Sequence, residues 1–249
     1  MSTVLFSFFI GLIASFYGSF TGGAGMLSIP VLIFIGIPAD IAVASNKMGD
    51  FGRFTTSAFK FIRSQQVVWK LVFWFIPISI IGGVIGAFLL SKFEVLNLQK
   101  ITGVMIIAFI PVLLLSKKIG IENIETSSVK KKNGMICYFL MSIYGASIQI
   151  GSGPIIIYLI SWFFGTTLIQ SNATSSIAWF FTTVSSLASL IYLGYVNFHI
   201  GIPLMIGSSI GGYLGAHTAL SKGNKWTKAF FTIVVLAMAL KIILDSTYH

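Results

Sequence analysis

The chain has 249 residues, of which 56% are hydrophobic and 9% charged, and its mean hydropathy is +0.94. A soluble domain carries about 25% charged residues, so this composition excludes a water-soluble globule and predicts an all-α protein that crosses a membrane several times. The net charge of +10 does not indicate nucleic-acid binding, because the basic residues lie in short gaps between apolar runs. Lysine and arginine in such gaps bias loops toward the cytoplasm, so we expect a multi-pass protein of the inner or plasma membrane.

Eight apolar runs are long enough, at about 20 residues each, to form spanning helices. In chain order they cover residues 4–36, 41–62, 67–91, 96–116, 134–164, 167–193, 196–220 and 226–245. The gap at 117–133 is long and carries five lysines. We therefore predict a first transmembrane repeat at 1–116, a charged cytoplasmic linker at 117–133 and a second transmembrane repeat at 134–249.

The two predicted halves share sequence. Ile81–Ala87 matches Ile210–Ala216 at an offset of 129, and Tyr17-Gly18 recurs as Tyr144-Gly145 at an offset of 127. Several matches in the same order at a nearly constant offset indicate an internal duplication. Duplicated halves with a site between them are typical of secondary transporters.

The first apolar run of each half contains a predicted helix break. Residues 4–36 would form a helix of about 50 Å, which is too long for one bilayer core and too short for two spans. Gly22–Gly25 interrupts this run, and Gly151–Gly153 with Pro154 interrupts the corresponding run. Glycine and proline destabilise helix interiors, so we expect a broken or re-entrant helix in each half, with the two breaks close together.

The topology depends on these breaks. With one pass per first run and the N-terminus inside, lysine and arginine divide nine to five in favour of the cytoplasm. If each first run enters and returns, with the N-terminus outside, they divide eleven to three. The positive-inside rule favours the second arrangement, in which the two halves are inverted repeats.

The run at 41–62 carries three charges, Lys47, Asp50 and Arg53, at a spacing that makes them neighbours on a helix. Each charge costs about 2.5–3.5 kcal/mol to insert, and one carboxylate neutralises only one of the two bases. The remaining positive charge suits a bound anion, with Asp50 tuning it or carrying a coupling proton. Two alternatives stay open, a salt-bridged trio that joins helices and a Lys47 that reaches the membrane interface.

Polar and glycine residues of both halves complete the candidate site. Broken helices expose backbone N–H groups and positive helix ends that bind anions, whereas Gly82/Gly86 and Gly211/Gly215 are spaced for helix packing. The predicted substrate-binding residues are Gly22, Gly23, Gly25, Ser45, Asn46, Lys47, Arg53, Gly151, Ser152, Gly153, Asn172, Thr174 and Ser175. The single cysteine, Cys137, excludes an intrachain disulfide or thiolate cluster, and we expect no cofactor or metal.

The chain resembles the sulfite exporter TauE/SafE family, also called the 4-toluene sulfonate uptake permease family. The resemblance rests on glycine-rich stretches followed by proline, as in Gly22–Gly25 with Pro30 and Gly151-Ser152-Gly153-Pro154, and on Ala44-Ser45 and Ala173-Thr174-Ser175. It implies transport of sulfur-containing or related small organic anions, such as sulfite, sulfoacetate or sulfonates, coupled to an ion gradient. The chain departs from the family pattern at Ala24 and Ser152 and at Asn46-Lys47.

Three other functions are compatible with parts of the sequence. An anion channel or a non-transporting membrane scaffold would have the same composition, and a channel would conduct without saturating. A rhomboid-like intramembrane protease would use Ser147 or Ser152 with His199 or His217, but Ser152 corresponds to Ala24 in the other half, which is no nucleophile. We therefore expect a transporter rather than an enzyme, with a small anion and a coupling ion such as the proton as partners, and a homodimer as one option for its assembly.

Overall fold

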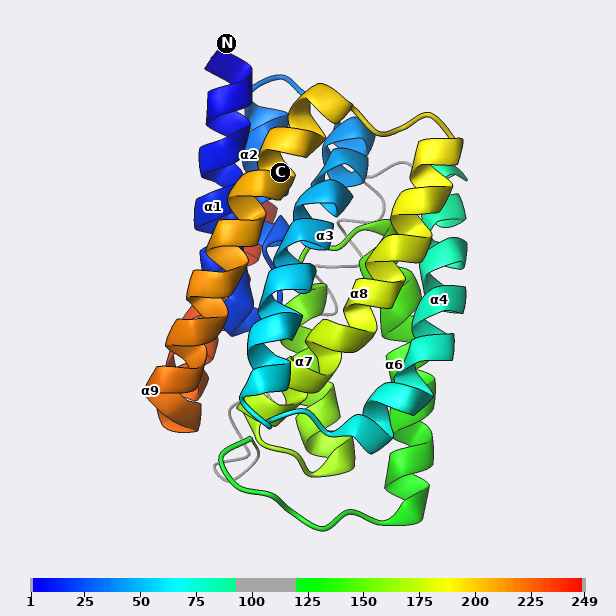
Figure 1. Ribbon diagram of the computed structural model, residues 1–249, viewed down its shortest axis with the longest axis vertical. Coiled ribbons are helices and arrows are strands. Elements are labelled where there is room, and N and C mark those ends of the chain that lie inside the picture. Colours follow the sequence, from blue (N-terminus) through cyan, green and yellow to red (C-terminus); the bar gives the residue numbers. More distant parts are fainter. Residues whose placement is uncertain (1, 93–119, 248–249) are drawn as a thin grey trace.

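A computed structural model describes residues 2–92 and 120–247 of the chain (Figure 1). These residues form α-helices joined by short connections. In chain order the helices are α1 Ser2–Thr21, α2 Gly25–Phe34, α3 Ala39–Arg63, α4 Trp69–Lys92, α6 Ser128–Ser147, α7 Ser152–Phe164, α8 Leu168–Tyr192 and α9 Phe198–Thr247. The all-α prediction is confirmed for this part of the chain, and the predicted run at 96–116 lies outside it.

The two long apolar runs are each divided into two helices. α1 ends at Thr21 and α2 begins at Gly25, whereas α6 ends at Ser147 and α7 begins at Ser152. Positive φ angles at Gly22 (80°) and Gly151 (76°) turn the chain at the breaks. Glycine adopts this conformation without a Cβ penalty, which explains why the breaks fall at the glycine-rich sequences.

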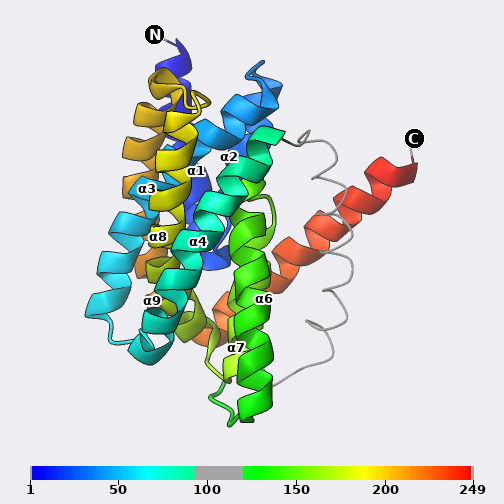
Figure 2. The ribbon, with the colours of Figure 1, turned by 90° about the vertical axis from the view of Figure 1, so that its right-hand side faces the viewer.

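The two helices on either side of each break form a pair, and the pairs α1–α2 and α6–α7 enter the bundle from opposite ends. In Figures 1 and 2, α1 starts at the upper end of the bundle and α2 returns to that end, whereas α6 starts at the lower end and α7 returns there. The same figures place both the α2–α3 and the α8–α9 connections at the upper end and the α3–α4 and α7–α8 connections at the lower end. Most described basic residues outside the centre lie at the lower end, at the ends of α3, α4 and α6 and beside the kink of α9: Lys60, Arg63, Lys70, Lys130, Lys131, Lys132, Lys222 and Lys225.

Glycine residues of α4 and α9 allow close packing between the first four described helices and the last four. A Cβ at Gly82 or Gly86 of α4 would overlap atoms of α6, and one at Gly211 or Gly215 of α9 would overlap atoms of α1. On the same faces, Gly83 packs against α8 and Gly212 against α3. The packing interpretation of both glycine motifs is therefore confirmed, and each motif contacts corresponding helices on the other side of the molecule.

One boundary differs from the sequence prediction. α6 begins at Ser128, inside the predicted linker, because the Ser127 hydroxyl caps the helix by accepting from the Lys130 N–H. The runs at 196–220 and 226–245 correspond to the two helical parts of α9, which meet at a kink where the backbone of Gly223 is non-helical (φ 82°, ψ 175°). Among the described helices, those over Thr3–Thr21, Trp69–Lys92 and Leu168–Tyr192 are long and apolar enough to cross a membrane.

Candidate functional site

Three charged residues of α3 are buried in the centre of the bundle. Lys47, Asp50 and Arg53 each retain 2% of their accessible surface. Arg53 donates to Asp50 Oδ1 from Nη2 at 3.1 Å and from Nε at 3.3 Å. This ion pair uses the single carboxylate of the trio. Lys47 therefore lacks a carboxylate partner among the described residues.

Each base extends from α3 to the C-terminal end of a different helix, Arg53 to α1 and Lys47 to α6. Arg53 donates to the carbonyl oxygens of Gly18 and Gly22 at 3.4 Å each, where α1 ends. Lys47 Nζ donates to Gly145 O at 2.7 Å, where α6 ends. A helix C-terminus carries about half a negative charge, so each base is partly neutralised by the helix that it caps. The burial of Lys47 contradicts the alternative in which it reaches the membrane interface.

The two helix breaks are in contact. A Cβ on Gly153 would overlap the backbone of Gly22 and Gly23, and a Cβ on Gly23 would lie 3.2 Å from Pro154 Cδ. The expectation that the breaks lie close together is confirmed. The N-terminal ends of α2 and α7 therefore start next to each other, within the same buried region as the two bases.

We expect Gly153→Ala to disrupt this junction strongly, because the added methyl group has no space against the Gly22 backbone. A destabilisation of about 2–4 kcal/mol is expected from the overlap. Gly23→Ala is the matched control, since its methyl group needs only a small shift of Pro154. Size-exclusion profiles and thermal unfolding of the purified variants test this. An equal effect of both substitutions would contradict the described contact.

Unpaired amide groups lie at the start of α2. Asn46 Oδ1 accepts from Ser28 Oγ at 2.6 Å, whereas its Nδ2 has no partner among the described residues. Gln149, from the second break, packs against the position of Gly25, and its Oε1 also has no partner there. Gly25 and Ser28 are one helical turn apart, so Asn46 and Gln149 flank the same side of α2. Buried polar groups are normally paired, and these two are available to a ligand.

Sequence reasoning missed Gln149, although it stands in the predicted break. The φ angle of Gln149 is 69°, which is unusual for a residue other than glycine. No sequence pattern predicts this conformation. The neighbouring Ser152 donates to Gln149 O at 2.8 Å, so this predicted site residue closes the turn.

The predicted site residues of α8 form three different kinds of hydrogen bond. Asn172 Nδ2 donates to Ser19 O at 2.6 Å and so joins α8 to the last turn of α1, next to the bases. Ser175 donates to Asn172 O within its own helix at 3.1 Å. The hydroxyl oxygen of Thr174 accepts from Val68 N at 3.0 Å, outside the central cluster.

Ser45 has the same kind of partner as Thr174. Its hydroxyl oxygen accepts from Asn197 N at 3.0 Å, in the connection that precedes α9, whereas Val68 lies in the connection that precedes α4. The structure therefore brings Asn46, Lys47, Arg53, Asn172 and the glycine breaks together. It assigns Ser45 and Thr174 to the anchoring of the two connections.

The serine residues of the protease alternative have no histidine beside them. Ser147 donates to Tyr144 O and Ser152 to Gln149 O. Both His199 and His217 have exposed side chains on α9, and His217 lies nearer the surface than its position in an apolar run suggested. The geometry gives neither serine a general base.

Buried charges and two touching helix breaks within a helical membrane protein are the features of a membrane transporter. The model of the sulfite exporter TauE/SafE family matches residues 7–242, and the chain belongs to this family. The family consists of transporters, not enzymes.

Relatives of similar length carry names of the same class. A probable membrane transporter protein of Haemophilus influenzae is 24% identical over 96% of this chain and 93% of its own length. The probable membrane transporter protein YfcA of Escherichia coli is 25% identical over 96% and 89%, and the ORF9 protein of a Sinorhizobium species, also named a probable membrane transporter, is 24% identical over 98% and 93%. No solved structure matches the chain.

Proposed function

We propose that the protein is a secondary transporter of small sulfur-containing anions of the sulfite, thiosulfate, sulfoacetate or sulfonate type. The observation that carries this proposal is the buried Lys47, which lies without a carboxylate partner among the described residues at the junction of the two breaks. Two bases and one acid leave a net positive charge there, which the end of α6 offsets only in part. A monovalent or divalent anion would complete the neutralisation.

The ends of the broken helices provide a second argument for an anion. The C-terminal ends of α1 and α6 are capped by Arg53 and Lys47. The N-terminal ends of α2 and α7 have no acidic residue in their first turns. Their N–H groups and positive partial charge face the junction and can bind an oxyanion. The unpaired Asn46 Nδ2 adds a side-chain donor on the same side.

We infer an alternating-access mechanism from the arrangement of the helix pairs. α1–α2 and α6–α7 open toward opposite ends of the bundle, as inverted re-entrant repeats would (Figure 1). Moving one pair relative to the other would expose the junction to one side at a time. The central residues are buried in the described conformation, which corresponds to a state closed to both sides. In this mechanism Asp50 responds to the coupling ion by releasing or holding Arg53.

This arrangement predicts that the lower end of the bundle in Figure 1 faces the cytoplasm, because the basic residues gather there. A cysteine at Asn123, in a Cys137→Ser background, is expected to resist a membrane-impermeant maleimide added to intact cells. A cysteine at His199, at the opposite end, is the control and should be labelled. Both side chains are exposed, so access to the protein surface is matched. Labelling of position 123 from outside would reverse the topology.

The substrate class is tested by uptake into proteoliposomes. Radiolabelled sulfite, thiosulfate, a sulfonate and a carboxylate are compared with and without a pH gradient. Saturable uptake of a sulfur oxyanion above that of the carboxylate is expected, and a proton-coupled carrier requires that the gradient change its rate. Equal uptake of all four anions without saturation would favour the channel alternative.

A further inference from the structure

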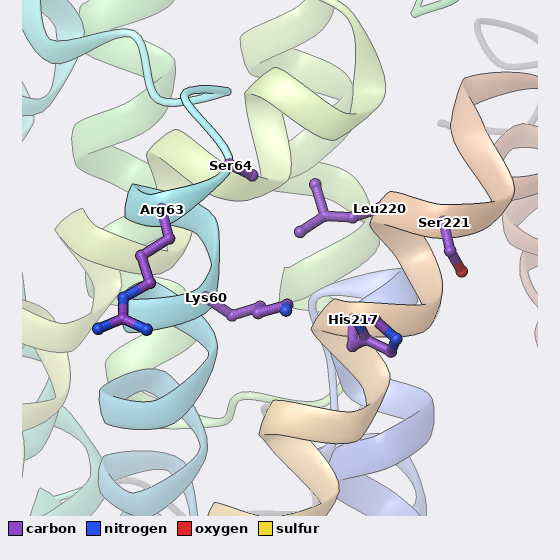
Figure 3. Close-up of a pocket in the computed structure, with 6 residues that line it drawn as sticks. All are labelled: Lys60, Arg63, Ser64, His217, Leu220 and Ser221. Carbon is purple, nitrogen blue, oxygen red and sulfur yellow. The ribbon is translucent and has the colours of Figure 1, made fainter.

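A basic cavity lies between α3 and α9 at the lower end of the bundle, away from the central junction. Its volume is about 310 Å³, and it is lined by Lys60, Arg63, Ser64, His217, Leu220 and Ser221. Figure 3 shows Lys60 extending from α3 toward α9, where His217 projects, while the guanidinium of Arg63 is turned away from α9. The proposed transport site does not use any of these side chains.

The positive charge of this cavity is not neutralised by carboxylates. Neither Lys60 nor Arg63 has an acidic partner within 4.0 Å among the described residues. Their charged groups lie instead over aromatic rings, Lys60 Nζ 5.3 Å from the Tyr213 centroid and Arg63 Cζ 4.2 Å from that of Phe59. The C-terminal dipole of α3 offsets about half of one charge. More than one unit of positive charge therefore remains for a ligand.

Hydrogen-bond donors in the cavity come from the basic residues and the imidazole. Ser64 and Ser221 donate to carbonyl oxygens of their own helices, Phe61 O and Thr218 O. The ammonium group of Lys60 has three donors, and an imidazole has at least one in either protonation state. This set fits an anion with several oxygen atoms, such as a phosphate.

Apolar side chains extend from the cavity along the outer surface of both helices. Phe59 and Ile62 of α3 and Tyr213 and Leu214 of α9 are 42–50% exposed. On α9 the exposed residues continue one turn apart toward the upper end as Ile210, Ile206 and Ile202. In a membrane protein such a stripe faces lipid. A basic cavity at the base of an apolar stripe matches a molecule with an anionic head and an apolar tail.

We propose that this cavity binds the phosphate headgroup of an anionic glycerophospholipid of the cytoplasmic leaflet, with the acyl chains against the exposed face of α3 and α9. Lys60 and His217 contact the phosphate, and Arg63 swings from the ring of Phe59 to close the rim. A soluble anion would satisfy the charge but would leave the apolar stripe unused. The bound lipid holds the ends of α3 and α9 together and thereby stabilises the folded bundle.

The test measures thermal unfolding of the delipidated protein in a nonionic detergent with added lipid. Phosphatidylglycerol is expected to raise the unfolding midpoint by about 3–6 °C more than phosphatidylcholine with the same acyl chains. The double variant Lys60→Gln/Arg63→Gln should lose at least half of this difference. A separate His217→Gln variant should also reduce the difference between the two lipids. It provides the test if the double variant does not fold.

The chain offers a matched control. A second cavity of about 330 Å³ at the same end contains Lys131 and Lys132, so Lys131→Gln/Lys132→Gln removes the same charge elsewhere and should keep the response to phosphatidylglycerol. An equal loss in this control would show a general charge effect and overturn the site. Equal stabilisation of the parent protein by glycerol 3-phosphate would identify a soluble-anion site, and an equal response to both lipids would also refute the proposal.

Discussion

Replacing Lys47 with glutamine is expected to weaken binding of the transported anion by about 10- to 100-fold. A hydrogen bond to a charged group contributes about 1.5–3 kcal/mol, and each 1.4 kcal/mol corresponds to a factor of ten. Lys47 has 2% of its surface exposed and donates to Gly145 O at 2.7 Å, so its remaining donors lie in the buried junction. Removing its charge leaves Asp50 and Arg53 as a neutral pair, and the junction loses the charge that attracts the anion.

Saturation kinetics in proteoliposomes test this prediction, with the size-exclusion profile and the unfolding midpoint measured for the same preparations. Lys92→Gln is the control, because it removes one positive charge from the end of α4 and leaves the junction unchanged. We expect a raised KM for Lys47→Gln and the parent value for Lys92→Gln. If Lys47→Gln lowers the unfolding midpoint and leaves KM unchanged, Lys47 caps α6 and does not bind the substrate.

Arg53→Gln is expected to destabilise the fold more than any other single substitution at the site. It leaves Asp50 as an uncompensated buried carboxylate, which costs about 3–5 kcal/mol, and it also removes the donors to Gly18 O and Gly22 O. The double variant Asp50→Asn/Arg53→Gln removes both charges together. It should recover much of the lost stability, since no unpaired charge remains in the interior.

Thermal unfolding of Asp50→Asn, Arg53→Gln and the double variant completes a cycle that isolates the interaction of the pair. We expect the double variant to be more stable than Arg53→Gln alone and its transport to be insensitive to the pH gradient. Equal unfolding midpoints for Arg53→Gln and the parent protein would be incompatible with the buried ion pair. Retained pH coupling in a folded double variant would assign coupling to another group.

Much of the framework follows from local sequence. Gly22–Gly25 and Gly151–Gly153 predicted the helix breaks because glycine permits the positive φ angles found there. The spacing of Lys47, Asp50 and Arg53 predicted neighbouring charges on one helix, and Arg53 and Asp50 form an ion pair there. These features depend on residues within one or two turns of each other, where sequence patterns are informative.

The partners across the molecule could not be predicted in this way. Lys47 caps α6 through Gly145 O, 98 positions away, and Asn172 reaches Ser19 O over 153 positions. A sequence pattern of one half does not specify which backbone carbonyl of the other half faces a side chain.

The sequence matches between the two predicted halves contain one usable signal. Ser45 and Thr174 are related by the same offset of 129 as the glycine motifs, and so are Val68 and Asn197, the residues whose N–H groups they accept. Aligning the halves at this offset pairs Lys47 with Ser176 and Arg53 with Thr182. The charges of the site therefore belong to the first half alone.

Counterflow tests the central claim, secondary transport of an anion at the junction of the helix breaks, most directly. Proteoliposomes are loaded with unlabelled substrate, taken from whichever sulfur oxyanion the uptake comparison selects, and diluted into a trace of the labelled anion. A carrier with alternating access predicts a transient accumulation of label above its external concentration, which saturates with substrate and is reduced in Lys47→Gln but not in Lys92→Gln. Equilibration of the label without overshoot, accompanied by anion conductance, would contradict the account and identify a channel.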